Sequence, residues 1–215
     1  MRNFILLIPA LCLTTASWAN PQVSSKPSKA ECFYQLDPAT VKVTWTAFKT
    51  TEKVGVNGNV NEVKVVTPKK AKSLSVLLKG VNGSGGFDDV KKSESGNPGR
   101  DQTLFEKFFT LLSKKGQFKG GFATIKGDDQ AGKLNLMLSV NSKKGIVPMD
   151  YKLAADGAFE ATGSFDMLGF GMEKAHASIH QACEQLHKGK DGVSKTWTEV
   201  GLKIAATIQK DCAGK

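Results

Sequence analysis

The chain has 215 residues, a hydrophobic content of 40% and a formal net charge of +10 at pH 7. This length suits one domain of ordinary size or one large barrel, and we find neither an internal repeat nor a second domain. The lysines lie in small scattered groups without a basic stripe of interleaved aromatic residues, which argues against a nucleic-acid-binding protein. The basic balance fits solubility, and attraction to an anionic membrane surface stays an open alternative.

Residues 1–19 have the features of an export signal. Arg2 supplies the positive start, residues 4–13 form a short apolar run, and Ser17 and Ala19 are small residues of the kind that a signal peptidase reads. The apolar run is too short to span a bilayer, which needs about 20 residues. We therefore predict cleavage after Ala19 and a periplasmic or secreted protein. Residues 20–31 are polar and contain proline, which predicts a mobile N-terminal segment.

Apolar and polar side chains alternate over most of the chain from Cys32 onward. This period of two predicts antiparallel strands with one face toward a core and one toward water. Gly, Asn, Asp and Lys residues at the joins predict turns, and many consecutive strands predict a sandwich or a barrel. The apolar positions of the main runs are Val41, Val43, Trp45, Ala47; Leu74, Val76, Leu78; Leu134, Leu136, Leu138, Val140; Val147, Met149, Tyr151, Leu153; Phe159, Ala161, Gly163, Phe165; and Val200, Leu202, Ile204, Ala206, Ile208.

Two segments depart from this alternation. Over residues 102–114 apolar residues recur at helical spacing, and Asp101 is placed to cap the N-terminus of the helix. Over residues 172–188 the apolar residues Met172, Ala175, Ile179 and Leu186 share one helical face. The glycine-rich and charge-rich stretch 80–99 predicts a long loop.

The late helical segment carries all three histidines of the chain. His176, His180 and His187 share a narrow stripe with Cys183. Imidazole and thiolate ligands suit zinc or copper, so a metal-handling protein is one alternative. The other interpretation is an ordinary polar flank, because a rigid helix cannot wrap ligands from three turns around one ion.

The chain shows no catalytic constellation. It has no Gly-x-Ser-x-Gly elbow, and no serine is marked as a partner for a histidine base. The stretch Gly80 to Gly86 lacks the Gly-Lys-Ser/Thr ending of a phosphate-binding loop. We therefore predict a protein that is not an enzyme and needs no cofactor.

Four stretches stand in a characteristic order behind the export signal. They are Tyr34-Gln35-Leu36-Asp37-Pro38 with the alternating run 41–45, a Val54/Gly55/Val56/Gly58 turn, Arg100-Asp101-Gln102-Thr103-Leu104 with Phe108-Phe109, and the hairpin 134–153. Together these stretches resemble the YceI-like family of secreted lipid-binding barrels. The resemblance covers most of the chain after the signal, and its Arg-Asp-x-x-Leu segment is the most specific part.

The resemblance implies a mainly β fold. It implies an elongated antiparallel lipocalin-like β-barrel of about eight strands over residues 32–215, with helical insertions at about 102–114 and 172–188. Such a barrel would hold a long-chain apolar lipid of the isoprenoid, quinone or fatty-acyl type. A barrel filled by its own side chains, acting as an envelope-interaction module, is the alternative.

The residues expected to line such a barrel come from one face of each run. Arg100 is the candidate for ordering the mouth beside the first helix, and its alternative role is a structural pair with Asp101. The remaining candidate lining residues are Val43, Trp45, Leu74, Val76, Leu104, Phe108, Leu112, Leu136, Leu138, Met149, Phe159 and Phe165.

After signal removal three cysteines remain, which predicts one disulfide and one free thiol in an oxidising compartment. In a closed antiparallel barrel the start of the first strand lies near the end of the last, which favours Cys32–Cys212. The competitor is Cys183–Cys212, which would tie the late helix to the C-terminus. For partners the resemblance implies an apolar lipid, and a homodimer stays open.

Overall fold

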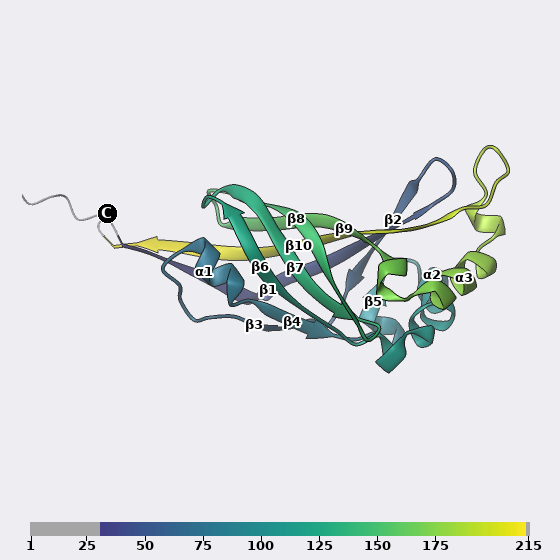
Figure 1. Cartoon of the computed structure of the whole chain (residues 1–215), viewed down its shortest axis with the longest axis horizontal. Coiled ribbons are helices and arrows are strands. Elements are labelled where there is room, and N and C mark those ends of the chain that lie inside the picture. Colours follow the sequence, from purple (N-terminus) through teal and green to yellow (C-terminus); the bar gives the residue numbers. More distant parts are fainter. Residues whose placement is uncertain (1–30, 214–215) are drawn as a thin grey trace, which may run out of the picture.

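The computed structural model describes residues 31–213 and shows an elongated molecule built on one curled antiparallel sheet (Figure 1). The predicted signal peptide and almost all of the predicted mobile segment 20–31 lie outside the described residues. The strands are β1 (Cys32–Lys49), β2 (Val54–Val60), β3 (Lys64–Val66), β4 (Asn82–Gly85), β5 (Ser93–Glu94), β6 (Phe118–Gly127), β7 (Ala131–Val140), β8 (Lys143–Leu153), β9 (Ala158–Asp166) and β10 (Thr196–Cys212). The α-helices are α1 (Leu74–Lys79), α2 (Pro98–Lys107) and α3 (Glu173–Ala182), and the 3₁₀ turns are η1 (Val90–Lys92), η2 (Phe109–Leu111), η3 (Ser113–Gly116), η4 (Met167–Phe170) and η5 (Gln185–His187).

The sheet has the strand order β3-β4-β6-β7-β8-β9-β10-β1-β2-β5. The two long strands β1 and β10 pair along nearly their whole length, so the first and last strands of the barrel are neighbours. Within residues 31–213 the edge strands β3 and β5 do not pair with each other. Beyond the sheet, Tyr34 and Ala71 exchange two backbone hydrogen bonds of 2.8 and 2.9 Å, which draw the chain after β3 onto the free edge of β1. The predicted antiparallel barrel is confirmed, with ten strands rather than about eight.

The extra strands lie where the sequence predicted a long loop. Within 80–99 the chain forms β4, the turn η1 and β5, each only two to four residues long. The residues predicted as a Val54/Gly55/Val56/Gly58 turn instead form β2, and the turn lies just before them at 50–53. Short strands rich in glycine carry too little alternation to be distinguished from loops.

The prediction of a strand around Leu74, Val76 and Leu78 is wrong, because these residues form helix α1. The hydroxyl of Ser73 accepts a hydrogen bond from the backbone N–H of Val76 at 3.2 Å and caps the helix. Leu74, Leu77 and Leu78 are fully buried, whereas Val76 is 56% exposed. Leucines at spacings of three and four residues suit a helix that covers β6 and β1 with one face.

The two predicted helical insertions exist with different bounds. Helix α2 begins four residues earlier than predicted, because Asn97 rather than Asp101 is its N-cap and accepts from the backbone N–H of Arg100 at 2.9 Å. Asp101 lies in the first turn, is buried, and accepts hydrogen bonds from the backbone N–H and the hydroxyl of Ser95. The second insertion consists of α3 and the separate turn η5, and Leu186 in that turn is 72% exposed rather than on the buried face.

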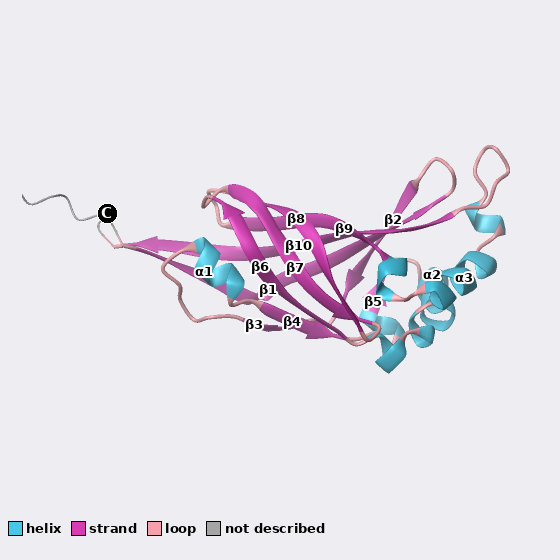
Figure 2. Ribbon diagram, in the orientation of Figure 1, coloured by secondary structure: helices cyan, strands magenta, loops and turns pink. Residues whose placement is uncertain are grey.

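The helices and the disulfide occupy opposite ends of the molecule. Helices α2 and α3 cover one end of the barrel, and the far end of β1 and β10 extends away from them (Figure 2). There the predicted disulfide between Cys32 and Cys212 is confirmed, joining residues that face each other in the β1–β10 register. Among the described residues no helix has the length and apolar character needed to cross a membrane.

A cavity in the barrel with one polar end

A cavity of about 670 Å³ lies inside the barrel. Its walls come from β1, β2, β3, β4, β6, β7, β9 and β10, and α2 and α3 contribute to its helical end. Sites for small molecules usually measure about 300–1,000 Å³ and are mainly apolar. The cavity therefore has the size and the lining that a small apolar ligand requires.

The alternation of β1 determines which side chains reach the cavity. Val41, Val43, Trp45, Ala47 and Lys49 line it at every second position, and Phe48 lines it as well where the β1–β10 register shifts. Opposite them in the β1–β10 register lie Ile204, Leu202, Val200 and Thr196, which line it as well. The two longest strands of the sheet thus form one continuous inner wall.

Ten of the thirteen residues predicted to contact a ligand line this cavity. Strands contribute six of them and the α2 region four, and their role in binding stays a prediction. They are Val43, Trp45, Leu136, Leu138, Phe159, Phe165, Arg100, Leu104, Phe108 and Leu112.

The other three predicted residues lie elsewhere. Leu74 is buried on the inner face of α1, and Val76 on the outer face of α1 is exposed to solvent. Met149 is 3% exposed and packs on β9, where a Cβ atom at Gly163 would stand 2.9 Å from its Cγ atom. Met149 belongs to the packed core beside the cavity, because the whole β8 strand stays outside the cavity wall.

The polar atoms of the cavity gather at its helical end. Lys49 ends β1, Arg100 lies in the first turn of α2, and Thr196 begins β10. Among the described lining residues Lys49 and Arg100 are the charged ones, and no aspartate or glutamate accompanies them. The inner part of the cavity is apolar, so a molecule inside it meets hydrocarbon along most of its length and positive charge at one end.

The three histidines converge on Thr196. The Nε2 atom of His176 lies 3.0 Å from the carbonyl oxygen of Thr196. The Nδ1 atoms of His180 and His187 lie 3.0 and 2.6 Å from its hydroxyl oxygen. A hydroxyl has one proton, so it donates to at most one of the two rings and accepts from the other. The histidine stripe thereby fastens α3 and η5 to the start of β10.

The metal-handling alternative finds no support in this arrangement. Among residues 31–213 no group of three or more His, Cys, Asp or Glu side chains is placed to hold a metal ion. Burial lowers the pKa of His187, and the positive charges of Lys49 and His180 lower it further. Burial raises the pKa of the free thiol Cys183, and Lys49 partly offsets that rise. Of these four residues, Cys183 and His187 line the cavity, and the three histidines contact Thr196.

Sequence reasoning missed Lys49, Thr196 and Trp197 as cavity residues. The signal for Lys49 was present, because it continues the inward positions 41, 43, 45 and 47 by one more step. Thr196 and Trp197 carried no such signal, because the β1–β10 register shifts between Ala47 and Lys49. An irregularity of this kind changes which side chains face inward without any mark in the local pattern.

Solved structures with the same architecture are known. A polyisoprenoid binding domain from Saccharophagus degradans implicated in plant cell wall breakdown has a TM-score of 0.53 and 9% identity, over 83% of this chain and 98% of that one. BcnA of Burkholderia cenocepacia has a TM-score of 0.52 and 16% identity, over 81% and 99%. The YCEI protein of Campylobacter jejuni has a TM-score of 0.52 and 13% identity, over 94% and 100%.

Sequence comparison adds nothing to these structural matches. No family model and no curated protein matches this chain. At identities of 9–16%, the similarity to these structures concerns the architecture alone. The chain has a YceI-like fold.

Proposed function

We propose that this protein binds a long-chain apolar lipid inside its barrel, as a carrier rather than an enzyme. The observation that carries the proposal is the cavity of about 670 Å³ with its apolar inner part. Each methylene group moved from water into such a space contributes about 0.8 kcal/mol. An isoprenoid, quinone or fatty-acyl chain would therefore bind without polar contacts along its length. The binding function named for the similar domain of Saccharophagus degradans supports the same class of ligand.

Native mass spectrometry of the protein purified from the cell envelope tests this proposal, together with solvent extraction of any bound mass. A stoichiometric apolar ligand is the expected result. A protein that stays bare after incubation with quinones and long-chain fatty acids would show that the cavity does not serve this purpose.

Two neighbouring residues of β7 provide a matched pair of variants. Leu138 lines the cavity, whereas Met137 points outward and is 46% exposed. Leu138→Glu places a carboxylate among apolar groups and should abolish lipid binding, whereas Met137→Glu should leave it unchanged. Far-UV circular dichroism of both variants separates lost binding from lost folding.

The proposal includes a periplasmic or secreted location. The disulfide between Cys32 and Cys212 supports it, because such bonds persist in oxidising compartments. Fractionation of cells that express the full chain, with the N-terminal residue of the exported form determined, tests both the location and the predicted cleavage after Ala19. The homodimer stays a prediction, which sedimentation equilibrium of the exported form checks.

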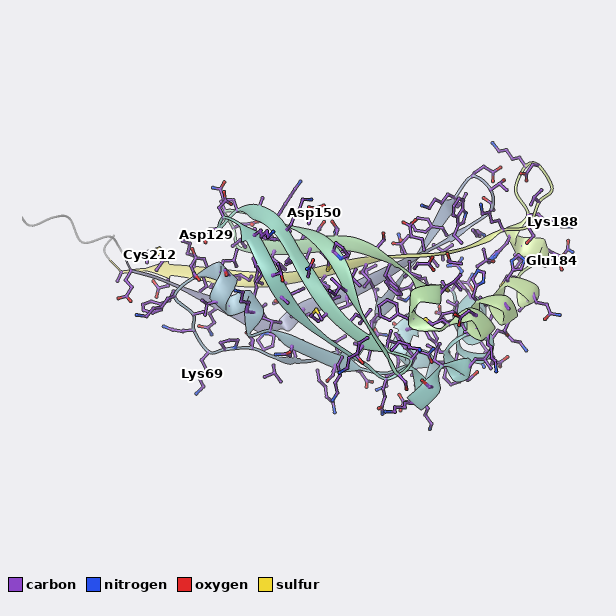
Figure 3. All side chains as sticks on the ribbon, viewed as in Figure 1. Lys69, Asp129, Asp150, Glu184, Lys188 and Cys212 are labelled. Carbon is purple, nitrogen blue, oxygen red and sulfur yellow. A yellow bond between two sulfur atoms is a disulfide. The ribbon has the colours of Figure 1, made fainter. Side chains whose placement is uncertain are left out.

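The proposal also places the polar end of the cavity against an anionic membrane surface during exchange. Leu186 lines the cavity and Val193 lies in the following loop, and they are 72% and 53% exposed. Lys188 and Lys190 lie between them in the sequence, at the helical end of the molecule, where Figure 3 labels Lys188. Exposed apolar side chains with adjacent lysines suit contact with anionic lipids.

Co-flotation with anionic vesicles tests this contact. Binding should weaken as salt rises, and Leu186→Asp should reduce it further. Val76→Asp is the matched control, because Val76 is 56% exposed on α1 away from the helical end. Equal flotation of the two variants would contradict the proposed contact.

A further inference from the structure

The charged side chains that line the cavity are all positive within the described residues. Lys49 and Arg100 line its helical end, and no acidic side chain lines any part of it within the described residues. Six ion pairs occur in the described part of the chain, and neither Lys49 nor Arg100 belongs to one. Within the described residues neither cation at the positive end of the cavity therefore has a direct ion-pair partner.

Two lysines on the outer face of the same sheet have carboxylate partners. Lys203 on β10 pairs with Glu160 on β9, and Lys133 on β7 pairs with Asp150 on β8 at 2.6 Å. Lys49 is half-buried on the inner face and has no carboxylate within 4.0 Å among the described residues. A partly desolvated ammonium group without a partner is unfavourable, so the inner face is prepared for an anion that comes from outside the chain.

The guanidinium of Arg100 likewise has no carboxylate partner among the described ion pairs. The carboxylate next to it, Asp101, is occupied by the backbone N–H of Ser95 at 2.9 Å and by the Ser95 hydroxyl at 2.5 Å. The guanidinium of Arg100 reaches only the Ser95 hydroxyl, at 3.4 Å. The structural pair of Arg100 with Asp101 that the sequence left open is absent from the described ion pairs, and the donors of the guanidinium remain available.

The surroundings of Lys49 are fixed in place. Lys49 and Thr196 are direct partners in the β1–β10 register. The Thr196 hydroxyl is held between the rings of His180 and His187, and His187 itself lines the cavity. Side chains held by such contacts offer a preorganised site, which lowers the entropy cost of binding.

We propose that the cavity takes an amphipathic lipid with an anionic head group, a carboxylate or a phosphate ester, whose head lies at Lys49 and Arg100 and whose chain extends into the barrel. This inference rests on the proposed lipid binding and adds the chemistry and the direction of the ligand. A neutral lipid of the same length fills the apolar part equally well and leaves both cations without a partner. The head group is therefore what the polar end selects.

Binding of hexadecanoic acid and hexadecanol to the delipidated, exported protein tests the inference by titration calorimetry. The two probes share a chain and differ in charge. We expect the acid, and likewise hexadecyl phosphate, to bind roughly tenfold or more tightly than the alcohol, as for a charge-assisted hydrogen bond. Inorganic phosphate alone should not displace the acid, because it lacks the chain.

Lys49→Met and Lys203→Met form a matched pair, since both remove one lysine charge from the β1–β10 ribbon. Lys49→Met should weaken binding of the acid by roughly tenfold and leave the alcohol unchanged, whereas Lys203→Met should change neither. Arg100→Met should act like Lys49→Met. Equal affinities for acid and alcohol in the wild type, or equal losses for both probes in Lys49→Met, would overturn the head-group inference while lipid binding stands. Failure of both probes to bind would overturn lipid binding itself.

Discussion

Trp45 lies over Gly58, its partner in the pairing of β1 with β2. A Cβ atom at Gly58 would stand 2.2 Å from the indole ring, so only glycine leaves room for it. The indole Nε1–H donates to the hydroxyl of Ser93 on β5 at 2.9 Å, which satisfies its polar atom. The ring is therefore held in one orientation as part of the cavity wall.

Gly58→Ala should force this ring to move. Overpacking of this kind typically costs about 1–3 kcal/mol, so we expect a lower midpoint of thermal unfolding and weaker lipid binding. Gly169→Ala is the control, because a Cβ atom there meets nothing within 4 Å. If Gly58→Ala melts at the same temperature as the control, the indole does not depend on the bare backbone beneath it.

The disulfide should contribute to stability without affecting ligand affinity. Cys32 and Cys212 are 180 residues apart in sequence, so their bond restrains the unfolded chain strongly. Replacing both by serine should lower the free energy of unfolding by about 2–5 kcal/mol in chemical denaturation. Affinity for a lipid should be unchanged, because the bond lies at the end opposite α2 and α3, where Figure 3 labels Cys212. A loss of affinity in folded protein would contradict this separation.

Tryptophan fluorescence should report both occupancy and direction of the ligand. Trp45 and Trp197 both line the cavity, Trp45 within the barrel and Trp197 at the start of β10. With the head group at Lys49, a fatty acid brominated near its carboxylate should quench Trp197 more strongly than Trp45. Trp45→Phe and Trp197→Phe, each in the form that starts at Asn20, isolate the two signals. Stronger quenching of Trp45 by that probe would indicate the reverse direction.

Stability should fall on acidification because of His187. Its pKa in the folded protein is lowered from 6.5 by burial and by the charges of Lys49 and His180. The unfolded chain therefore takes up a proton first as pH falls, so the contribution of His187 is fully present above about pH 6.5 and is lost below it.

Denaturant unfolding of wild type and His187→Gln at about pH 7.5 and about pH 5.5 checks this sign. The variant should lose less stability on acidification than the wild type does. His176→Gln is the comparison, because that ring bonds a backbone carbonyl rather than the Thr196 hydroxyl. An equal loss in wild type and His187→Gln would show that His187 does not carry the effect.

The alternation of side chains predicted the inner wall well where strands are long. Val43, Trp45, Leu136 and Leu138 face the cavity as the period of two requires. The Cys32–Cys212 bond followed from the expectation that the first and last long strands are neighbours, and β1 and β10 do pair.

The alternation of side chains could not predict features that depend on a helix cap, on the curvature of the sheet or on a contact between side chains. Leu74 and Leu78 fit a strand and a helix equally over so few residues, and the cap at Ser73 decided for the helix. Met149 alternates correctly, yet β8 lies outside the cavity wall, which depends on the curvature of the whole sheet. The isolation of Arg100 depends on Ser95 occupying Asp101, a contact that spacing alone does not reveal.

The two edge strands of the sheet are also its two shortest strands. Edge strand β3 has three residues and edge strand β5 has two, whereas β1 and β10 in the interior have 18 and 17. An exposed edge is where a second chain can add its own strand and begin a fibril. The strands β3 and β5 themselves therefore present few unpaired amides, so the two terminal strands of this mostly β architecture give a second chain little template for pairing, which suits the proposed role of a carrier that must stay dispersed.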